Sequence, residues 1–199
     1  VWGSIEYLQG LEAINTGSGA EYGGISCASV GNCTVAGGYG DDVGMQVFVV
    51  SQVDGVWGTV ETVPGLNAAN AGGDAGVRTV SCASPGNCVV GGIYADINYV
   101  NYGFLASQVD GVWQPFEDIP GFESLSDFGF SDVLSVSCAA PGNCSAVGNY
   151  AATGAGIQVF VTSIETFQAV TGVELQTVII GSGVTGYVEY LAGTEEVDG

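Results

Sequence analysis

Short apolar runs separated by turn-forming residues recur along the chain. A typical run is Gln46–Val50, and the pair Asp54-Gly55 follows it closely. Asp-Gly pairs favour the two-residue turns that join antiparallel strands. Pro-Gly pairs at Pro64 and Pro120 divide the chain further, as turn residues do. This pattern predicts many short strands joined by tight turns, and therefore an all-β fold.

The pattern is periodic, with a period of about 55 residues. Two independent markers keep the same phase along the chain, a tryptophan and a pair of cysteines with five residues between them. The markers are Trp2, Trp57 and Trp113, and the cysteines Cys27, Cys82 and Cys138. Agreement between the two series predicts three copies of one structural unit.

Each copy contains four strand signals. The first strand ends at a cysteine, a tight turn follows, and the second strand runs from the partner cysteine to a tyrosine. A loop rich in Gly, Asp and Asn leads to the third strand, and an Asp-Gly turn leads to a fourth strand that carries the tryptophan. Four antiparallel strands in each repeat are typical of a propeller blade. We therefore expect antiparallel, four-stranded, blade-like repeats in a β-propeller-like fold.

We place the first repeat at residues 1–55, the second at 56–111 and the third at 112–167. Residues 168–199 have no cysteine, and Ala169 stands at the tryptophan position, so we interpret them as a degenerate fourth repeat. Within it, residues 176–183 and 186–191 correspond to a second and a third strand.

The six cysteines form three pairs of identical spacing. Zinc sites more often use closer pairs combined with histidine, and the chain has no histidine. An even count with periodic placement favours local disulfides formed in an oxidising compartment. The predicted disulfides are Cys27–Cys33, Cys82–Cys88 and Cys138–Cys144. A loop of this size contributes about 2 kcal/mol to stability in the chain-entropy model.

The motif around each cysteine pair, exemplified by SCASPGNCVVGGIY from Ser81 to Tyr94, resembles the SCxSxxxCxAVGxY repeats of large secreted or surface proteins of Gram-positive, especially actinobacterial, bacteria. The resemblance covers residues 1–167. It implies a propeller-like β-fold and an extracellular or cell-surface location, and it implies no defined activity.

The two ends of the sequence match one another. The last residues, Val-Asp-Gly, followed by the first, Val-Trp-Gly, reproduce the internal turn at residues 53–58. We therefore expect the strand at 1–10 to complete the degenerate repeat of the same unit or of a neighbouring one, since an open strand edge needs a partner. The neighbouring unit is either a second molecule or the next period of a longer tandem polypeptide. The residues expected in these closing strands are Val1, Trp2, Tyr187, Val188, Tyr190, Val197, Asp198 and Gly199.

Composition excludes several functions. The chain carries 21 acidic residues against one basic residue, a net charge of −20, which excludes nucleic-acid binding. The longest apolar run, around 178–180, is far too short to span a bilayer, so we expect no membrane insertion. Histidine-dependent catalysis cannot be assembled. The carboxylate pairs Glu117/Asp118 and Glu195/Glu196 stand next to turns, where solvated charge is the default, so we predict a protein that is not an enzyme.

Two further features suggest ligands or modification. Asp41, Asp42 and Asp96 lie in the loop before the third strand and are candidate calcium ligands, although turn geometry also explains them. Apart from calcium we expect no cofactor. Asn32 and Asn143 begin Asn-x-Ser/Thr sequons and are candidate glycosylation sites, although asparagine also suits the turn itself.

The sequence favours a non-enzymatic extracellular structural protein, a unit of a surface fibre or filament in which copies bind one another head to tail by strand pairing. The alternative is a small propeller-type lectin or adhesin that holds glycans in loops such as 94–103.

Overall fold

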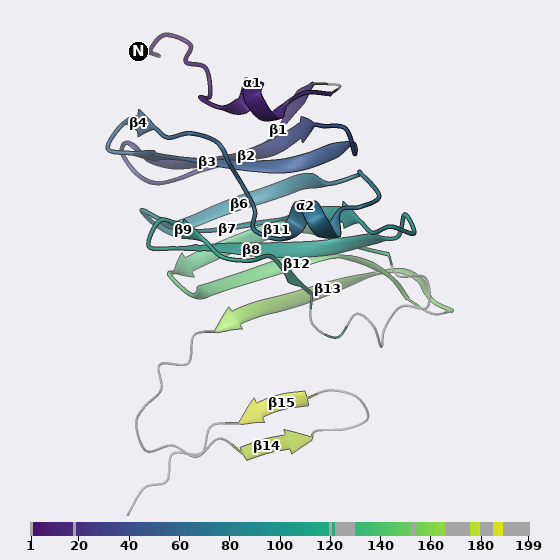
Figure 1. Ribbon diagram of the computed structural model, residues 1–199. Coiled ribbons are helices and arrows are strands. Elements are labelled where there is room, and N and C mark those ends of the chain that lie inside the picture. Colours follow the sequence, from purple (N-terminus) through teal and green to yellow (C-terminus); the bar gives the residue numbers. More distant parts are fainter. Residues whose placement is uncertain are drawn as a thin grey trace, which may run out of the picture. The chain divides into compact units, whose positions relative to one another are not determined.

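The computed structural model describes residues 2–17, 19–119, 121, 130–152, 154–165, 176–179 and 185–188. The chain divides into two compact units, residues 1–165 and residues 166–199, and each is described by itself. The first unit consists of three antiparallel sheets, one for each repeat (Figure 1). The predicted all-β fold of blade-like repeats is thus confirmed.

The first sheet contains β1 (Ala20–Ser29), β2 (Asn32–Gly40) and β3 (Met45–Val53), followed by the short strands β4 (Val56–Trp57) and β5 (Glu61–Thr62). The second sheet repeats this order with β6 (Gly76–Ser84), β7 (Asn87–Ala95), β8 (Asn101–Val109), β9 (Val112–Trp113) and β10 (Glu117–Asp118). The third sheet has β11 (Ser131–Ala140), β12 (Asn143–Ala152) and β13 (Gly156–Glu165).

The predicted fourth strand is interrupted in the structure. After the Asp54-Gly55 turn, with φ of 50° and 87°, Trp57 pairs with Gln52, whereas Glu61 pairs with Val49. Between these two pairs, three residues of the outer strand face two residues of β3. One extra residue on one strand is the defining feature of a β-bulge. The second sheet has the same break between β9 and β10. In the third repeat the predicted fourth strand lies outside the described residues.

The three sheets stack face to face in sequence order, with the first strands β1, β6 and β11 side by side (Figure 1). We call the face of a sheet that points toward the preceding sheet its front face, and the opposite face its rear face. For the first sheet, the rear face is the one that points toward the second sheet, and the front face is the other one. Val47 and Val49 on the rear face of the first sheet pack with Val90 and Phe104 on the front face of the second. Val89 and Leu105 of the second sheet belong to another apolar cluster, which they share with residues of the third sheet.

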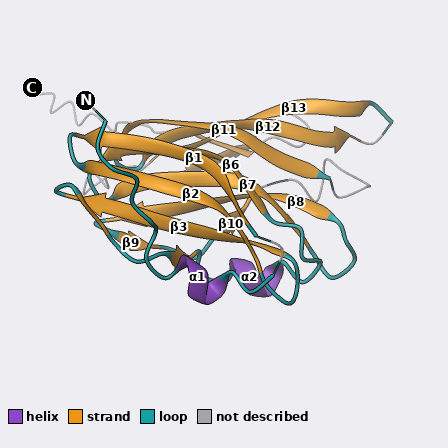
Figure 2. Cartoon of the chain, turned by 90° about the horizontal axis from the view of Figure 1, so that it is seen from above, coloured by secondary structure: helices purple, strands orange, loops and turns teal. Residues whose placement is uncertain are grey.

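A short helical linker precedes the first strand of the first and second sheets. These helices are α1 (Leu11–Ile14) and α2 (Leu66–Ala69), and both lie on the same side of the strands (Figure 2). Gly10 and Gly65 begin them with φ of 86° and 81°, a conformation that glycine adopts without steric cost. Leu66 is fully buried between the first two sheets, so the linker closes the side of the core.

The second unit contains the antiparallel pair β14 (Gln176–Ile179) and β15 (Thr185–Val188). These strands overlap the segments in which the second and third strands of a degenerate repeat are predicted.

Candidate assembly interface

All three predicted disulfides are present, and they lie where the sheets meet. The pairs are Cys27–Cys33, Cys82–Cys88 and Cys138–Cys144. Each bridges directly opposed residues of a first and a second strand. Cys88 and Cys144 are buried against the preceding sheet, whereas Cys27 on the first sheet is exposed. Three intrachain disulfides indicate an oxidising compartment.

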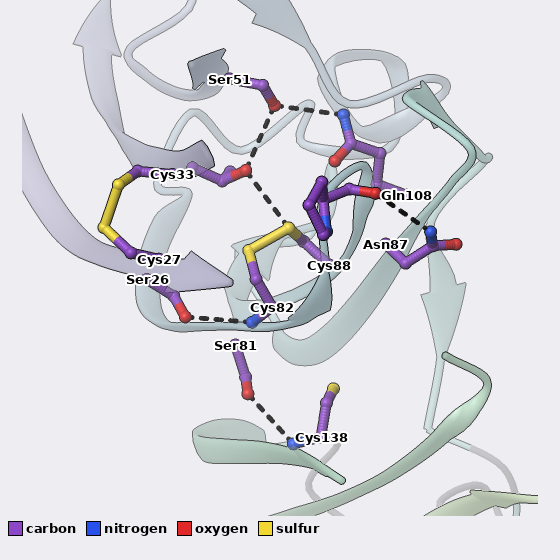
Figure 3. Close-up of a disulfide and its surroundings, with 12 residues drawn as sticks. Ser26, Cys27, Cys33, Ser51, Ser81, Cys82, Asn87, Cys88, Gln108 and Cys138 are labelled. Carbon is purple, nitrogen blue, oxygen red and sulfur yellow. Dashed lines mark hydrogen bonds between the residues drawn. A yellow bond between two sulfur atoms is a disulfide. The ribbon is translucent and has the colours of Figure 1, made fainter. Parts of the chain in front are cut away.

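The serine before each disulfide cysteine links consecutive sheets. The backbone N–H of Cys82 donates to Ser26 Oγ at 3.0 Å, and the N–H of Cys138 donates to Ser81 Oγ at 3.0 Å (Figure 3). The same contact therefore recurs from sheet to sheet along the stack. Sequence reasoning missed this role, although a serine precedes the first cysteine in every repeat.

A second set of polar contacts crosses between the first two sheets. Gln108 Nε2 donates to Ser51 Oγ at 3.1 Å, Ser51 is bonded to Thr34, and Thr34 Oγ1 lies 3.2 Å from Cys88 Sγ (Figure 3). These residues line a cleft of about 220 Å³. Gln108 is buried, and its Oε1 has no hydrogen-bond partner among the described residues.

The only basic residue of the chain joins the second and third sheets. Arg78 Nε lies 3.2 Å from Asp132 Oδ2, and the Asp132 side chain is 11% exposed. Burial raises the pKa of Asp132, and Arg78 acts in the opposite direction. The pair therefore compensates a carboxylate that the stacking of the sheets removes from water.

Replacing Arg78 with glutamine is expected to lower the free energy of unfolding by about 2 kcal/mol at pH 7, because a buried carboxylate loses its partner. Since burial raises the folded-state pKa of Asp132, the cost comes from its charged form. We expect the deficit to shrink as the pH falls toward 4, where the carboxyl is protonated. Urea titrations of both proteins from pH 4 to 7 measure this, with the double variant R78Q/D132N as the rescued control. A deficit independent of pH would contradict the assignment.

The linkers that carry α1 and α2 dock in the same way. Asn70 is fully buried, and its Oδ1 accepts from the N–H groups of Ala95 and Asp74. Its Nδ2 donates to Met45 O and Gln46 Oε1 on the preceding sheet. Asn15, at the matching position of α1, accepts from Gly40 N at 3.1 Å. In both copies an asparagine thus fixes the linker to the sheet that follows it.

The backbone before these helices also matches. Val60 N donates to Gln9 O at 2.9 Å, and Phe116 N donates to Pro64 O at 3.2 Å. Residues 2–8 therefore correspond in sequence to residues 57–63. Residues 57–63 form the interrupted outer strand of the first sheet, just before the second linker. In the chain by itself residues 2–8 form no strand, and Trp2 is 100% exposed.

The front face of the first sheet is covered only in part. Phe48 and Val50 are buried in a cluster with Leu8, Leu11 and Ile14 of the first linker, whereas the β1 side of the face is open. Tyr22 is 91% exposed, whereas Val77 and Val133 at the same position of the later repeats are 7% and 0% exposed. Ile25 is likewise exposed, and its counterpart Val136 is buried in the core between sheets two and three.

The rear face of the third sheet shows the converse. Val159 and Val161 are 67% and 73% exposed, and Ile157 beside them is exposed as well. Val47 and Val49, their counterparts on the first sheet, are fully buried. The stack therefore presents exposed apolar side chains at each of its two ends, among the residues that the structure describes.

The predicted calcium ligands lie in two turns and do not converge. Asp41 Oδ1 accepts from the N–H groups of Val43 and Gly44, and Asp96 Oδ1 accepts from those of Asn98 and Val100. Asp42 is exposed beside Asp41. Across the described ranges, no three acidic, cysteine or histidine side chains are grouped to hold a metal ion. The hydrogen bonds of Asp96 to Val100 and Asn98 lower its pKa.

The two sequons differ in their surroundings. Asn32 Nδ2 donates to Ser29 Oγ at 3.0 Å and to Val30 O, and its Oδ1 accepts from Asp54 N. Asn143 lies in the same turn of the third sheet, where Ala140 replaces the serine, and it is exposed. The side chain of Asn32 thus serves the turn geometry, which was the alternative to glycosylation.

The carboxylate pair Glu117/Asp118 has a structural partner. Asp118 Oδ1 accepts from Tyr94 Oη at 2.7 Å, which ties β10 to β7. Burial first, and then Asp118, raise the pKa of Tyr94 well above its usual range. Glu195 and Glu196 lie outside the described residues.

Of the predicted closing strands, Tyr187 and Val188 belong to β15. Val1, Tyr190, Val197, Asp198 and Gly199 lie outside the described residues. Neither helix in the described part of the chain has the length and apolar composition needed to cross a membrane.

No protein-family model matches the chain, and a search of curated proteins finds no relative. The resemblance to the SCxSxxxCxAVGxY repeat proteins therefore stays a prediction.

Proposed function

We propose that this chain is a non-enzymatic, extracellular structural protein whose copies bind one another head to tail in a fibre or surface layer. One observation carries the proposal. Tyr22 and Ile25 on the front face of the first sheet are exposed, and so are Val159 and Val161 on the rear face of the third sheet. The residues at the matching positions inside the stack are buried or half-buried. A surface that can be covered by its own repeat at either end builds an open chain of copies.

The composition and the disulfides support an extracellular fibre. Three local disulfides stabilise small domains outside the cell. The chain has one basic residue, which leaves few sites for trypsin-like proteases. The nine long strands described in the first unit carry only four charged residues, which are Glu21, Arg78, Asp132 and Glu165. Such a unit needs neither a ligand nor a cofactor to serve as building material.

A carbohydrate-binding module is the second candidate, and the cleft beside Cys88 favours it. The side chains that line this cleft include Thr34, Ser51 and Gln108. Hydroxyl and amide groups of this kind can bind sugar hydroxyls. The two candidates differ in what they do without a ligand.

Sedimentation of the purified chain at increasing concentration and ionic strength separates them. We expect polymers that lengthen with concentration and with salt, because salt screens the repulsion between units of net charge −20. Added glycans should leave the size distribution unchanged. A discrete particle at every concentration, together with binding on a glycan array, would replace the structural proposal with the carbohydrate-binding one.

A further inference from the structure

We propose that the front face of the first sheet of one copy packs against the rear face of the third sheet of a second copy, and so continues the stack from chain to chain. The inference rests on the proposed function and names the two surfaces that join. The occupant of each surface is another copy of this chain, since the joints inside the chain have the same chemistry.

The apolar residues of the two surfaces match an interface that the chain already makes twice. Inside the stack, a rear pair such as Val47 and Val49 meets a front set that includes Val77 and Val90. At the ends, the rear pair is Val159 and Val161, and the front set begins with Tyr22. Joining the two ends would bury side chains that are 60% exposed or more. The packing would be the same as that between consecutive sheets inside the chain.

The polar groups of the joint are in register as well. Ser26 and Ser81 accept from the cysteine N–H of the following sheet. Ser137 holds the same position on β11 and is exposed. In the proposed joint it faces the N–H of Cys27 from the second copy. Ser145 and Ser163 are bonded at 2.9 Å on the exposed rear face, as Thr34 and Ser51 are bonded inside the stack.

Asn15 supplies a further match. The side-chain amide of its counterpart Asn70 donates to Met45 O and Gln46 Oε1 on the preceding sheet. The residues at those positions of the third sheet are Ile157 and Gln158. The proposed joint therefore places Asn15 of one copy beside Ile157 and Gln158 of the other.

The interface is heterologous, because the two surfaces differ and each copy carries both. Such a joint leaves one free surface at each end of every oligomer, so growth continues until the copies form a ring or a fibre. The wild-type chain alone therefore cannot show which surfaces meet. Two variants that each disable one surface can show it.

The front variant is Y22E/I25E, and the rear variant is V159E/V161E. All four positions are exposed, so the fold should tolerate the change, and circular dichroism and thermal melting check this. The control is V30E/I97E, which adds the same charge at exposed residues on turns. A carboxylate buried in the joint without a partner disfavours association strongly. We expect each variant to weaken self-association by at least about 100-fold, and the control to assemble like the wild type.

Mixing the two variants gives the decisive readout. The front variant keeps a working rear face, and the rear variant keeps a working front face. Analytical ultracentrifugation of the equimolar mixture should show a one-to-one dimer that grows no further.

Three outcomes would overturn the inference. A rear variant that still polymerises removes the third sheet from the joint. A front variant that still polymerises removes the first sheet from the joint. Both results leave the proposed fibre function standing, whereas a wild-type chain that stays monomeric at every salt concentration overturns the function and the joint together.

Discussion

Replacing Gly92 with alanine is expected to lower the free energy of unfolding by at least about 3 kcal/mol, the upper range for an overpacked core. Gly92 lies on β7, where β6 bulges toward it. A Cβ at this position would overlap the carbonyl oxygen of Gly76 and press on the backbone of Val77. Backbone atoms in a hydrogen-bonded sheet cannot move aside as a side-chain tip can, so the sheet itself must distort.

Gly76→Ala is the matched control. Gly76 is on the neighbouring strand and pairs with Ile93, beside Gly92. Its added Cβ would meet only the end of the Arg78 side chain, 4.0 Å away. Chemical unfolding of the two variants should therefore show a large loss for G92A and a change within about 1 kcal/mol for G76A. Equal losses would show that the close approach of the strands is not the cause.

Replacing Asn70 with alanine is expected to cost about 3–4 kcal/mol, because several buried groups lose their partners at once. Asn70 is fully buried between the first two sheets. Its amide donates to Met45 O at 2.7 Å, and its Oδ1 accepts from Ala95 N at 3.1 Å. The alanine variant leaves the Ala95 N–H without this acceptor and opens a space in the core.

Asn15→Ala is the control for Asn70→Ala. Asn15 occupies the matching position of the first linker, is half-buried, and accepts from Gly40 N. In the unassembled chain its loss should cost about 1 kcal/mol, the worth of one hydrogen bond. Thermal unfolding at a concentration too low for assembly compares the two. If N15A lowered the stability as much as N70A, the contacts of Asn70 with the preceding sheet would not be what stabilises the second linker.

Much of the fold could be predicted from local signals. Asp54-Gly55 and Asp110-Gly111 adopt the left-handed conformations that an Asp-Gly hairpin turn requires. The cysteine spacing predicted the disulfides, because a tight turn places both partners opposite each other on paired strands. These features depend on neighbours in sequence, which is why residue type and spacing were sufficient.

The arrangement between sheets could not be predicted in the same way. Thr34 and Cys88 touch across 54 positions of sequence, and nothing local marks either residue for this contact. The fourth strand was expected to be continuous, but an extra residue between Trp57 and Glu61 interrupts it, and residue pattern alone does not count the residues on the opposing strand.

The candidate site was predicted in part. The sequence indicated that residues 1–10 need a partner, but it did not identify the exposed rear face of the third sheet, because Val159 and Val47 look alike until burial separates them.

Electron cryomicroscopy of the native material without added ligand tests the central claim most directly. We expect fibres in which one copy follows another by the sheet stacking seen within the chain, with Tyr22 of one copy against Val159 and Val161 of the next. Closed particles of uniform size, with both end faces covered inside a single chain, would contradict it.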